Sequence, residues 1–479
     1  MMTAEDTIAA PATGSQPAAL GIIRVSGPRA IEIADSVWKG ARLQDTPAGT
    51  VRLGMLLAAD GSPVDQVVAT VFRAPHSFTG EDTVELSHHG SRWIRRVLLQ
   101  RLCEAGARMA EPGEFSRRAF LNGKMDLAQA EGVADLIASS SRASQRMAMN
   151  QMRGGFSRSL ENLRSQLIEL ASLLELELDF SEEDVEFADR SRMRSLAEKL
   201  HTSIARLHRS FSTGQAIKEG IPIAIVGPTN AGKSSLLNLM LGDRRAIVSD
   251  IHGTTRDTIE ETMELGDYLF RFIDTAGLRL TDDPIEKIGI ERSQEALGKA
   301  SLVLLITDPT APTSGITADG LSQAASGLPQ AAAEMLQKAD RDGKLIPIIN
   351  KTDVAREEDI EAMRLALSRT YSSQPAEISA KQGDGLDELE QRIINYADAA
   401  FDESSTTEGI VVTNRRHAEA LRHADSNLQR LLEGMDAGLP ADLLAQDLRE
   451  AIHHLGTVTG AITTPDILHT IFSRFCIGK

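Results

Sequence analysis

The chain has 479 residues and a formal net charge of −17 at pH 7, with 42% hydrophobic and only 4% aromatic residues. The length suggests about three domains, and the acidic balance argues against nucleic-acid binding over the whole surface, which needs many cationic contacts to phosphate. The two cysteines, Cys103 and Cys476, indicate a reduced, cytoplasmic protein rather than a disulfide framework. No apolar run approaches the roughly 18 residues of a membrane span. Residues 1–6 are acidic and lack a signal peptide's basic region, so we expect neither a signal peptide nor a membrane span.

Residues 1 to about 120 mix strand-like and helix-like segments. Strands are predicted at Leu20–Val25 and Asp65–Phe72, and helices at Arg29–Trp38 and Gly90–Ala105, with turn signals between them. This mixture predicts an α+β domain. Arginines in and after the second helix form either a local basic patch or, more commonly, a solvated helix face: Arg92, Arg95, Arg96, Arg101 and Arg108.

From about Asp126 to Phe211 the hydrophobic period becomes helical. Leucines recur every three or four residues, which predicts a buried core stripe rather than a zipper: Leu160, Leu163, Leu167, Leu170 and Leu174.

A phosphate-binding motif follows an apolar strand predicted at Ile221–Val226. The run Gly-Pro-Thr-Asn-Ala-Gly-Lys-Ser at residues 227–234 fits G-x-x-x-x-G-K-[ST] and precedes a helix predicted at Ser235–Leu241, which Gly242 ends. The glycines let backbone N–H groups turn toward phosphate oxygens, Lys233 reaches the terminal phosphates and Ser234 binds Mg²⁺. A glycine-rich turn that binds nothing rarely has this strand–loop–helix context.

Two further motifs fit the phosphate side of a nucleotide site. A strand at Tyr268–Ile273 leads into Asp274-Thr275-Ala276-Gly277, where Asp274 can support the Mg²⁺ shell and the Gly277 N–H can sense the γ-phosphate. Thr255, in Gly-Thr-Thr-Arg-Asp at residues 253–257, is the candidate switch threonine for the same ion.

The base is identified further along the chain. A buried strand at Leu345–Ile349 precedes Asn350-Lys351-Thr352-Asp353, and Asp353 can accept from both N1–H and the exocyclic amine of guanine, a donor pair that adenine lacks. Residues 379–381, Ser-Ala-Lys, follow a third short strand and support the base. Together the motifs predict guanine-nucleotide hydrolysis. The predicted GTP-binding residues are Asn230, Ala231, Gly232, Lys233, Ser234, Ser235, Ser249, Thr254, Thr255, Asp274, Thr275, Ala276, Gly277, Asn350, Lys351, Asp353, Ser379, Ala380 and Lys381.

Strands and helices alternate over residues 217 to about 398, which predicts a doubly wound α/β domain. Pro309–Gly343 is rich in Ala, Ser and Gly and predicts a loop with one helix around Gln330–Ala339. From Thr413 onward the pattern is helical again, with Leu444, Leu448, Ala451 and Leu455 on one face. Because neither helical block closes a core alone, we expect one discontinuous all-α domain with the nucleotide domain inserted into it.

The predicted boundaries are therefore residues 1–122 for the α+β domain, 123–216 and 401–479 for the two parts of the helical domain, and 217–400 for the inserted P-loop GTPase domain.

The hydrolytic water needs an orienting group. Many GTPases use a Gln directly after Asp-x-x-Gly, but Leu278 occupies this position. Glu286, in an acidic turn, is the candidate, and an ordinary surface carboxylate is the equally weighted alternative on residue grounds. Arg256 and Arg279 are arginine-finger candidates that are equally compatible with solvated side chains.

Cys476 lies in Cys-Ile-Gly-Lys, where a final Lys fits prenylation poorly. It is either an inert cysteine or a thiol that the nearby Lys479 activates for catalysis. The pairs His88-His89 and His453-His454 lack acidic or cysteine partners at ligand spacing and are more typical of core or solvent histidines than of a metal site.

Further motifs resemble those of the bacterial tRNA-modification GTPase family known as MnmE or TrmE over nearly the whole chain. They are Asp6–Ala10, Gly21–Gly27, Ser77–Asp82, Pro112–Ser116, Leu127–Glu131 and Phe475–Lys479. The resemblance implies a cytoplasmic homodimer that works with tRNA and an FAD-containing partner, MnmG or GidA. The pair installs an aminomethyl-type or carboxymethylaminomethyl group at carbon 5 of the wobble uridine of certain tRNAs. A reduced folate similar to 5-formyltetrahydrofolate supplies the one-carbon unit.

The resemblance also implies roles for individual residues. Catalytic positions correspond to Glu286 and Cys476, and Mg²⁺ positions to Ser234 and Thr255. The potassium-binding positions correspond to Asn230, Ser249, Ile251 and Thr254. A potassium ion there would put positive charge where an arginine finger sits in other GTPases. Folate positions correspond to Arg24, Glu81, Lys124 and Lys479. The chain departs from the family in a long 309–343 segment and in Pro228-Thr229, where a proline directly before Asn230 is expected.

Two other functions compete with tRNA modification. A ribosome-assembly GTPase would carry a basic RNA-binding appendage, which we do not find. A regulatory GTPase without modification chemistry would not need the Cys-Ile-Gly-Lys sequence or the folate-type residues.

Overall fold

The computed structural model describes residues 6–181, 190–242, 261–273, 296–310, 330–401, 410–473 and 475–478. The chain divides into two compact units. The first comprises Met1–Ala134, Gln151–Leu200 and Ser426–Lys479, and the second comprises Asp135–Asn150 and His201–Asp425. This division into two units does not test the predicted domain boundaries at residues 122, 216 and 400, which remain a prediction.

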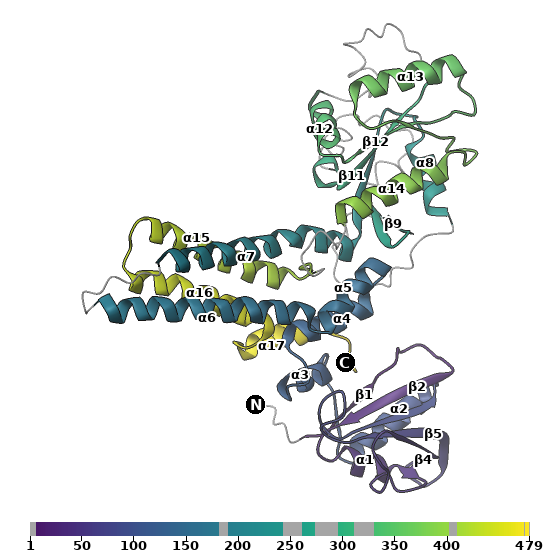
Figure 1. Ribbon diagram of the computed structural model, residues 1–479. Coiled ribbons are helices and arrows are strands. Elements are labelled where there is room, and N and C mark those ends of the chain that lie inside the picture. Colours follow the sequence, from purple (N-terminus) through teal and green to yellow (C-terminus); the bar gives the residue numbers. More distant parts are fainter. Residues whose placement is uncertain are drawn as a thin grey trace. The chain divides into compact units, whose positions relative to one another are not determined.

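A seven-stranded sheet forms the N-terminal part of the first unit, with the spatial order β3-β4-β5-β6-β2-β1-β7 (Figure 1). β1 is parallel to β7, and the other neighbours are antiparallel. The strands are β1 (Ile8–Pro11), β2 (Leu20–Ser26), β3 (Trp38–Lys39), β4 (Thr50–Leu57), β5 (Pro63–Phe72), β6 (Thr83–His89) and β7 (Arg108–Met109). β2 and β5 confirm the two strands predicted here.

Two helices, α1 (Ala30–Ser36) and α2 (Arg92–Glu104), pack against this sheet. Strand β5 shows why one face is buried, because Val67, Ala69 and Val71 alternate with more exposed residues and join the core under the helices. Both helices were predicted, but the first ends before Trp38, which lies in β3.

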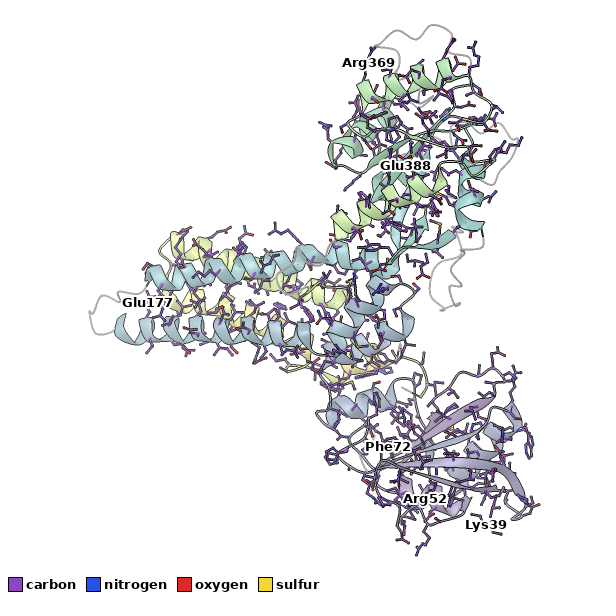
Figure 2. The ribbon with its side chains drawn as sticks, turned by 45° about the vertical axis from the view of Figure 1, so that its right-hand side comes forward. Lys39, Arg52, Phe72, Glu177, Arg369 and Glu388 are labelled. Carbon is purple, nitrogen blue, oxygen red and sulfur yellow. The ribbon has the colours of Figure 1, made fainter. Side chains whose placement is uncertain are left out.

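The helices of the first unit come from both ends of the chain. Besides α1 and α2, they are α3 (Glu114–Leu121), most of α4 (Leu127–Ala138), α6 (Gly155–Ser181), the start of α7 (Arg190–Glu219), the end of α15 (Arg415–Asp436), α16 (Ala441–Thr459) and α17 (Pro465–Phe472). α6 packs along α16, and the predicted leucine stripes of both helices are buried. Glu177, near the end of α6, accepts a hydrogen bond from Arg190 Nε at 2.6 Å and so joins α6 to the start of α7 (Figure 2).

The second unit contains a six-stranded sheet with the order β13-β12-β11-β8-β10-β9, in which only β9 is antiparallel to its neighbour. Its strands are β8 (Ile221–Val226), β9 (Glu261–Leu265), β10 (Tyr268–Phe272), β11 (Leu302–Thr307), β12 (Leu345–Ile349) and β13 (Ala376–Glu377). β8, β11 and β12 are nearly continuous buried apolar runs, as expected for strands covered on both faces.

Helices cover both faces of this sheet. α8 (Lys233–Leu241) and α14 (Leu386–Phe401) pack on one face, and α12 (Gln330–Arg341) and α13 (Glu357–Thr370) on the other. Figure 2 labels Arg369 on α13 and Glu388 on α14. α5 (Arg142–Met152) adds Ala143 and Met147 to the core beneath α8 and α14.

α15 (Arg415–Asp436) begins in this unit, where His201 Nε2 of α7 lies 3.3 Å from Asp425 Oδ1. The two units together confirm the predicted fold class: an α+β domain, a helical domain with segments before and after the nucleotide fold, and a doubly wound α/β domain. Among the helices that the structure describes, none contains an 18-residue stretch apolar enough to cross a bilayer.

Candidate functional site

The loop at residues 227–234 connects the end of β8 to the start of α8. Gly227 and Gly232 have φ angles of +152° and +101°. A Cβ atom on either would lie within 3.0 Å of a neighbour, the Ile306 carbonyl oxygen for Gly227 and the Asn350 amide nitrogen for Gly232. Only glycine fits this close approach, so the loop keeps the tight curve that lets backbone N–H groups surround a phosphate.

Lys233, the first residue of α8, directs its side chain back over this loop. Its Nζ donates hydrogen bonds to the carbonyl oxygens of Gly227 at 2.9 Å and Pro228 at 2.8 Å. Burial lowers the pKa of Lys233, and an anionic phosphate oxygen nearby would favour the charged ammonium. Asn230, in the same loop, has a left-handed backbone with φ of +63°.

Asn350 joins the phosphate-binding loop to the loop after β13. Its side chain is 2% exposed. Nδ2 donates to the Ala231 carbonyl oxygen at 2.8 Å, and Oδ1 accepts from the Ala380 N–H at 2.9 Å. The three predicted motifs that these residues represent therefore meet at the carboxyl ends of β8, β12 and β13.

The candidate base-recognition carboxylate is also held in place. Asp353 Oδ1 accepts from the Ser379 hydroxyl at 2.8 Å, which orients the carboxylate beside the loop that contains Lys381. Lys351, with φ of +62°, pairs with Asp308 Oδ2 at 2.6 Å. Sequence reasoning missed Asp308, although its position directly after the buried strand β11 is the same signal that identified the residues after β12.

Several predicted residues lie outside the described part of the chain. They are Ser249, Ile251, Thr254, Thr255, Asp274, Thr275, Ala276, Gly277, Glu286 and Lys479. The structure does describe the approach to Asp274, because β10 runs parallel to β8 and the Ile273 N–H donates to the Ile223 carbonyl oxygen at 3.0 Å. The chain therefore leaves β10 at the same sheet edge as the phosphate-binding loop.

A second candidate site lies in the N-terminal domain around Arg24 of β2. Its guanidinium pairs with Glu85 Oε1 at 2.8 Å and lies 5.0 Å from the centre of the Phe78 ring and 5.6 Å from that of Phe115. A cation flanked by aromatic faces and a carboxylate suits a flat, polar, anionic ligand.

Glu81 lies beside the same strand. It accepts a hydrogen bond from the Ser26 hydroxyl at 2.8 Å, and its two carboxylate oxygens each lie 3.2 Å from Arg118 Nη1. Lys124, the third described folate candidate, donates to the Pro75 carbonyl oxygen at 2.9 Å.

Arg118 also belongs to an ion-pair network that sequence reasoning missed. Arg118 contacts Asp6, and Arg108 bridges Asp6 at 2.8 Å and Glu114 at 2.7 Å. Burial opposes ionisation of Asp6 and Glu114, but the arginine hydrogen bonds and charges outweigh it, so both carboxyl pKa values lie below their usual range. Asp6 lies more than 100 residues away in sequence from both Arg108 and Arg118, so no local pattern marks the network.

Cys476 lies in the first unit, together with Arg24 and Glu81, whereas Lys233 lies in the second. The cysteine is exposed, and its carbonyl oxygen accepts from the Gly113 N–H at 3.4 Å. This placement groups the thiol with the N-terminal candidate site rather than with the nucleotide loops.

Four of the five arginines of the possible basic patch, namely Arg92, Arg95, Arg101 and Arg108, have partners within the N-terminal domain. Arg95 donates to the carbonyl oxygens of Gly14 and Ser15, and Arg101 pairs with Glu104 at 2.9 Å. These contacts favour the ordinary structural explanation over a nucleic-acid patch.

Known proteins and family models match this chain over nearly its whole length. A family model described as the MnmE helical domain matches residues 127–476, and one described as the GTP-binding protein TrmE N-terminus matches residues 7–124. The tRNA modification GTPase MnmE of Bacteroides thetaiotaomicron is 46% identical over 482 residues, covering 99% of this chain and 100% of the relative. The protein of the same name from Christiangramia forsetii is 46% identical over 485 residues, covering 100% of both.

Solved structures match parts of the chain. The G domain of the T. maritima FeoB iron transporter covers 37% of this chain and 98% of its own, with 24% identity and a TM-score of 0.25. Aquifex aeolicus Era covers 44% of this chain and 67% of its own, with 24% identity and a TM-score of 0.27.

Proposed function

The chain belongs to the family of tRNA modification GTPases called MnmE, and we propose that it couples GTP hydrolysis to modification of carbon 5 of the wobble uridine in certain tRNAs. The group added is of the aminomethyl or carboxymethylaminomethyl type. The observation that carries the proposal is the presence of two separate candidate sites in one chain: the loops joined by Asn350, and the Arg24–Glu81 site with Cys476 in the other unit.

In the nucleotide site, each described residue has one task. Lys233 exchanges its bonds to the loop carbonyls for bonds to the terminal phosphates, and the N–H groups at the start of α8 bind phosphate oxygens. Asp353, oriented by Ser379, accepts from the two donors of guanine. Ser234 and Thr255 would hold Mg²⁺ through their hydroxyl oxygens, and the ion would neutralise charge on the phosphates.

Hydrolysis needs a group that orients water and a positive charge near the departing phosphate. Leu278 cannot orient water, so Glu286 takes that role. Asn230, an exposed residue of the phosphate-binding loop with a left-handed backbone, would bind potassium together with the backbone of Ser249, Ile251 and Thr254. The ion would supply the positive charge that an arginine finger supplies elsewhere.

The modification half uses the N-terminal site. Arg24 and Lys124 provide cations for an anionic folate, Glu81 provides a hydrogen-bond acceptor, and the partly buried Phe78 ring provides an apolar face. The Phe115 ring is fully buried and supports the Arg24 guanidinium from within the core. Lys479 and the Cys476 thiol complete the site. The chain forms a cytoplasmic homodimer, and FAD belongs to an MnmG- or GidA-type partner protein.

Potassium dependence is tested by GTP turnover in KCl and NaCl at equal ionic strength. The parent protein turns over faster in KCl, and Asn230→Ala removes most of the difference. Equal rates of the parent in both salts would refute the potassium site and leave the guanine-recognition argument standing.

Folate binding is tested by calorimetric titration with 5-formyltetrahydrofolate. Arg24→Ala weakens binding on the order of tenfold to a hundredfold, because it removes a charge-assisted contact worth about 1.5–3 kcal/mol. Arg52→Ala, a matched change on β4 of the same domain, leaves the affinity near the parent value (Figure 2). Equal affinity of both variants would exclude Arg24 from the folate site. Undetectable binding to the parent would favour a regulatory GTPase without modification chemistry.

A further inference from the structure

The segment that contains Cys476 is fixed by its backbone while its thiol stays exposed. Upstream, Phe472 and Phe475 pack their rings 5.4 Å apart in a cluster with Leu127, and the Phe475 N–H donates to the Phe472 carbonyl oxygen at 3.0 Å. These contacts hold the chain on both sides of α17's end without using the cysteine side chain.

Gly113, at the start of α3, makes the next contact. Its N–H points to the Cys476 carbonyl oxygen at 3.4 Å, and its φ is +66°. A Cβ atom here would lie within 3.0 Å of the Phe472 carbonyl oxygen, so any other residue would push away the backbone that leads to Cys476. α3 and α17 lie side by side in Figure 1.

Gly478 makes a matching contact on the far side of the cysteine. Its φ is +97°, and a Cβ atom there would lie within 3.0 Å of the Pro11 carbonyl oxygen at the end of β1. Cys476 therefore lies between two glycines, one that its carbonyl oxygen contacts and one that follows it in sequence. Each glycine packs closely against backbone of the first unit. A side chain that served packing would be buried here, whereas this one is exposed.

From this geometry we propose that Gly113 and Gly478 are positioning residues, which fix the Cys476 thiol for the modification reaction. The inference rests on the proposed function of Cys476. A displacement of about 1 Å at a reacting group can cost on the order of 10²-fold in rate, so even a small shift of this backbone should be visible in the modification rate.

The test uses Gly113→Ala and Gly478→Ala in the full chain, with Gly49→Ala as the matched control. Gly49 has a similar φ of +72° in the same domain, but nothing lies within 4 Å of its Cβ position. The control therefore carries the same backbone strain without the clash. If Gly113→Ala fails to fold, Gly478→Ala still tests the proposal, because its substitution lies near the end of the sequence.

Two measurements are made on each variant. The first is the initial rate of wobble-uridine modification in extract from a strain that lacks this protein. Tryptophan fluorescence checks the folding of the first unit, which contains both tryptophans, and GTP turnover checks the second unit. The second is hydrogen exchange of the peptide spanning residues 470–479, which reports how firmly the backbone around Cys476 is held. We expect both test variants to lose at least about tenfold in modification rate and to exchange faster in this peptide. GTP turnover stays normal, and Gly49→Ala behaves like the parent.

Cys476→Ser separates the two ways of failing. If it is inactive while Gly113→Ala and Gly478→Ala modify tRNA at the parent rate, the positioning role is wrong and the proposed function stands. If Cys476→Ser is fully active, the proposed role of the thiol is wrong and the positioning role falls with it. Unchanged hydrogen exchange in both glycine variants would also contradict the proposal that Gly113 and Gly478 fix the backbone around Cys476.

Discussion

The Asn350 side chain donates a hydrogen bond to the Ala231 carbonyl oxygen across 119 residues of sequence, and this buried contact ties base recognition to phosphate binding. Asn350→Ala would leave that oxygen and the Ala380 N–H without their partner. We expect about 2–4 kcal/mol weaker binding of GDP and GTP, since each unsatisfied buried group costs roughly 1–3 kcal/mol. Titration with a fluorescent nucleotide measures this loss. Asn395→Ala, at an exposed position of α14, is the control, and equal affinity of the two variants would contradict the role of Asn350.

Asp353→Asn should change the preferred base. The new amide would lose two charge-assisted contacts to guanine, worth about 1.5–3 kcal/mol each, so GTP affinity should fall on the order of 10²–10⁴-fold. An amide N–H can donate to the 2-oxo group of xanthine, so XTP should bind better than GTP. Competition between the two nucleotides measures the switch. Asp359→Asn, a surface change on α13, should leave the preference for GTP intact, and an unchanged preference in Asp353→Asn would refute base recognition by this residue.

Acid should destabilise the N-terminal domain through Asp6 and Glu114. Their folded-state pKa values lie below the ordinary values of 3.8 and 4.5, so the folded state binds fewer protons than the unfolded state. The stabilisation is complete above about pH 4.5 and is lost as the pH falls through the folded pKa values. Both tryptophans, Trp38 and Trp93, lie in this domain, so their fluorescence reports its unfolding selectively.

Arg108→Met tests the origin of this acid sensitivity. It should lower the free energy of unfolding at pH 7 by about 1–3 kcal/mol, less than for a fully buried pair because the Arg108 side chain is 36% exposed. It should also flatten the fall in stability between pH 5 and pH 3. Arg29→Met removes an exposed pair with Glu32 and should change little. A pH profile of Arg108→Met identical to the parent's would show that the network does not set the acid response.

Glu286→Ala should slow the chemical step by roughly 10²–10⁴-fold and leave nucleotide affinity nearly unchanged, because a water-orienting group acts in the transition state. Single-turnover hydrolysis and nucleotide titration separate the two quantities. A large loss of affinity at an unchanged rate would instead make Glu286 a structural residue of the switch segment.

The nucleotide fold was predictable because its signals are local. β8 and β12 begin and end at the predicted residues, since each is a buried apolar run followed by a motif that ends it. α8 begins two residues earlier than predicted, at Lys233, because the phosphate-binding loop passes directly into the helix. Asp308 could have been found from its place after a strand.

Other features depend on contacts between distant segments. The residues of α5 read as part of a continuous helical block, yet Ala143 and Met147 pack into the core of the nucleotide sheet. The pairing of Arg118 with Asp6 and the close approach of Gly113 to Phe472 have no periodicity or motif that marks them. Such contacts follow from tertiary packing, which a single sequence does not reveal.

The nucleoside composition of tRNA tests the coupling of the two sites most directly. A strain that lacks this protein is complemented with the parent chain, Lys233→Ala, Cys476→Ser or Cys103→Ser, and its tRNA nucleosides are measured by mass spectrometry. Lys233→Ala should lose GTP turnover and Cys476→Ser should keep it, but both should lack the modified wobble uridine. The parent and Cys103→Ser, which changes the half-buried second cysteine, should restore it. Full modification with either Lys233→Ala or Cys476→Ser would contradict a reaction that needs both sites.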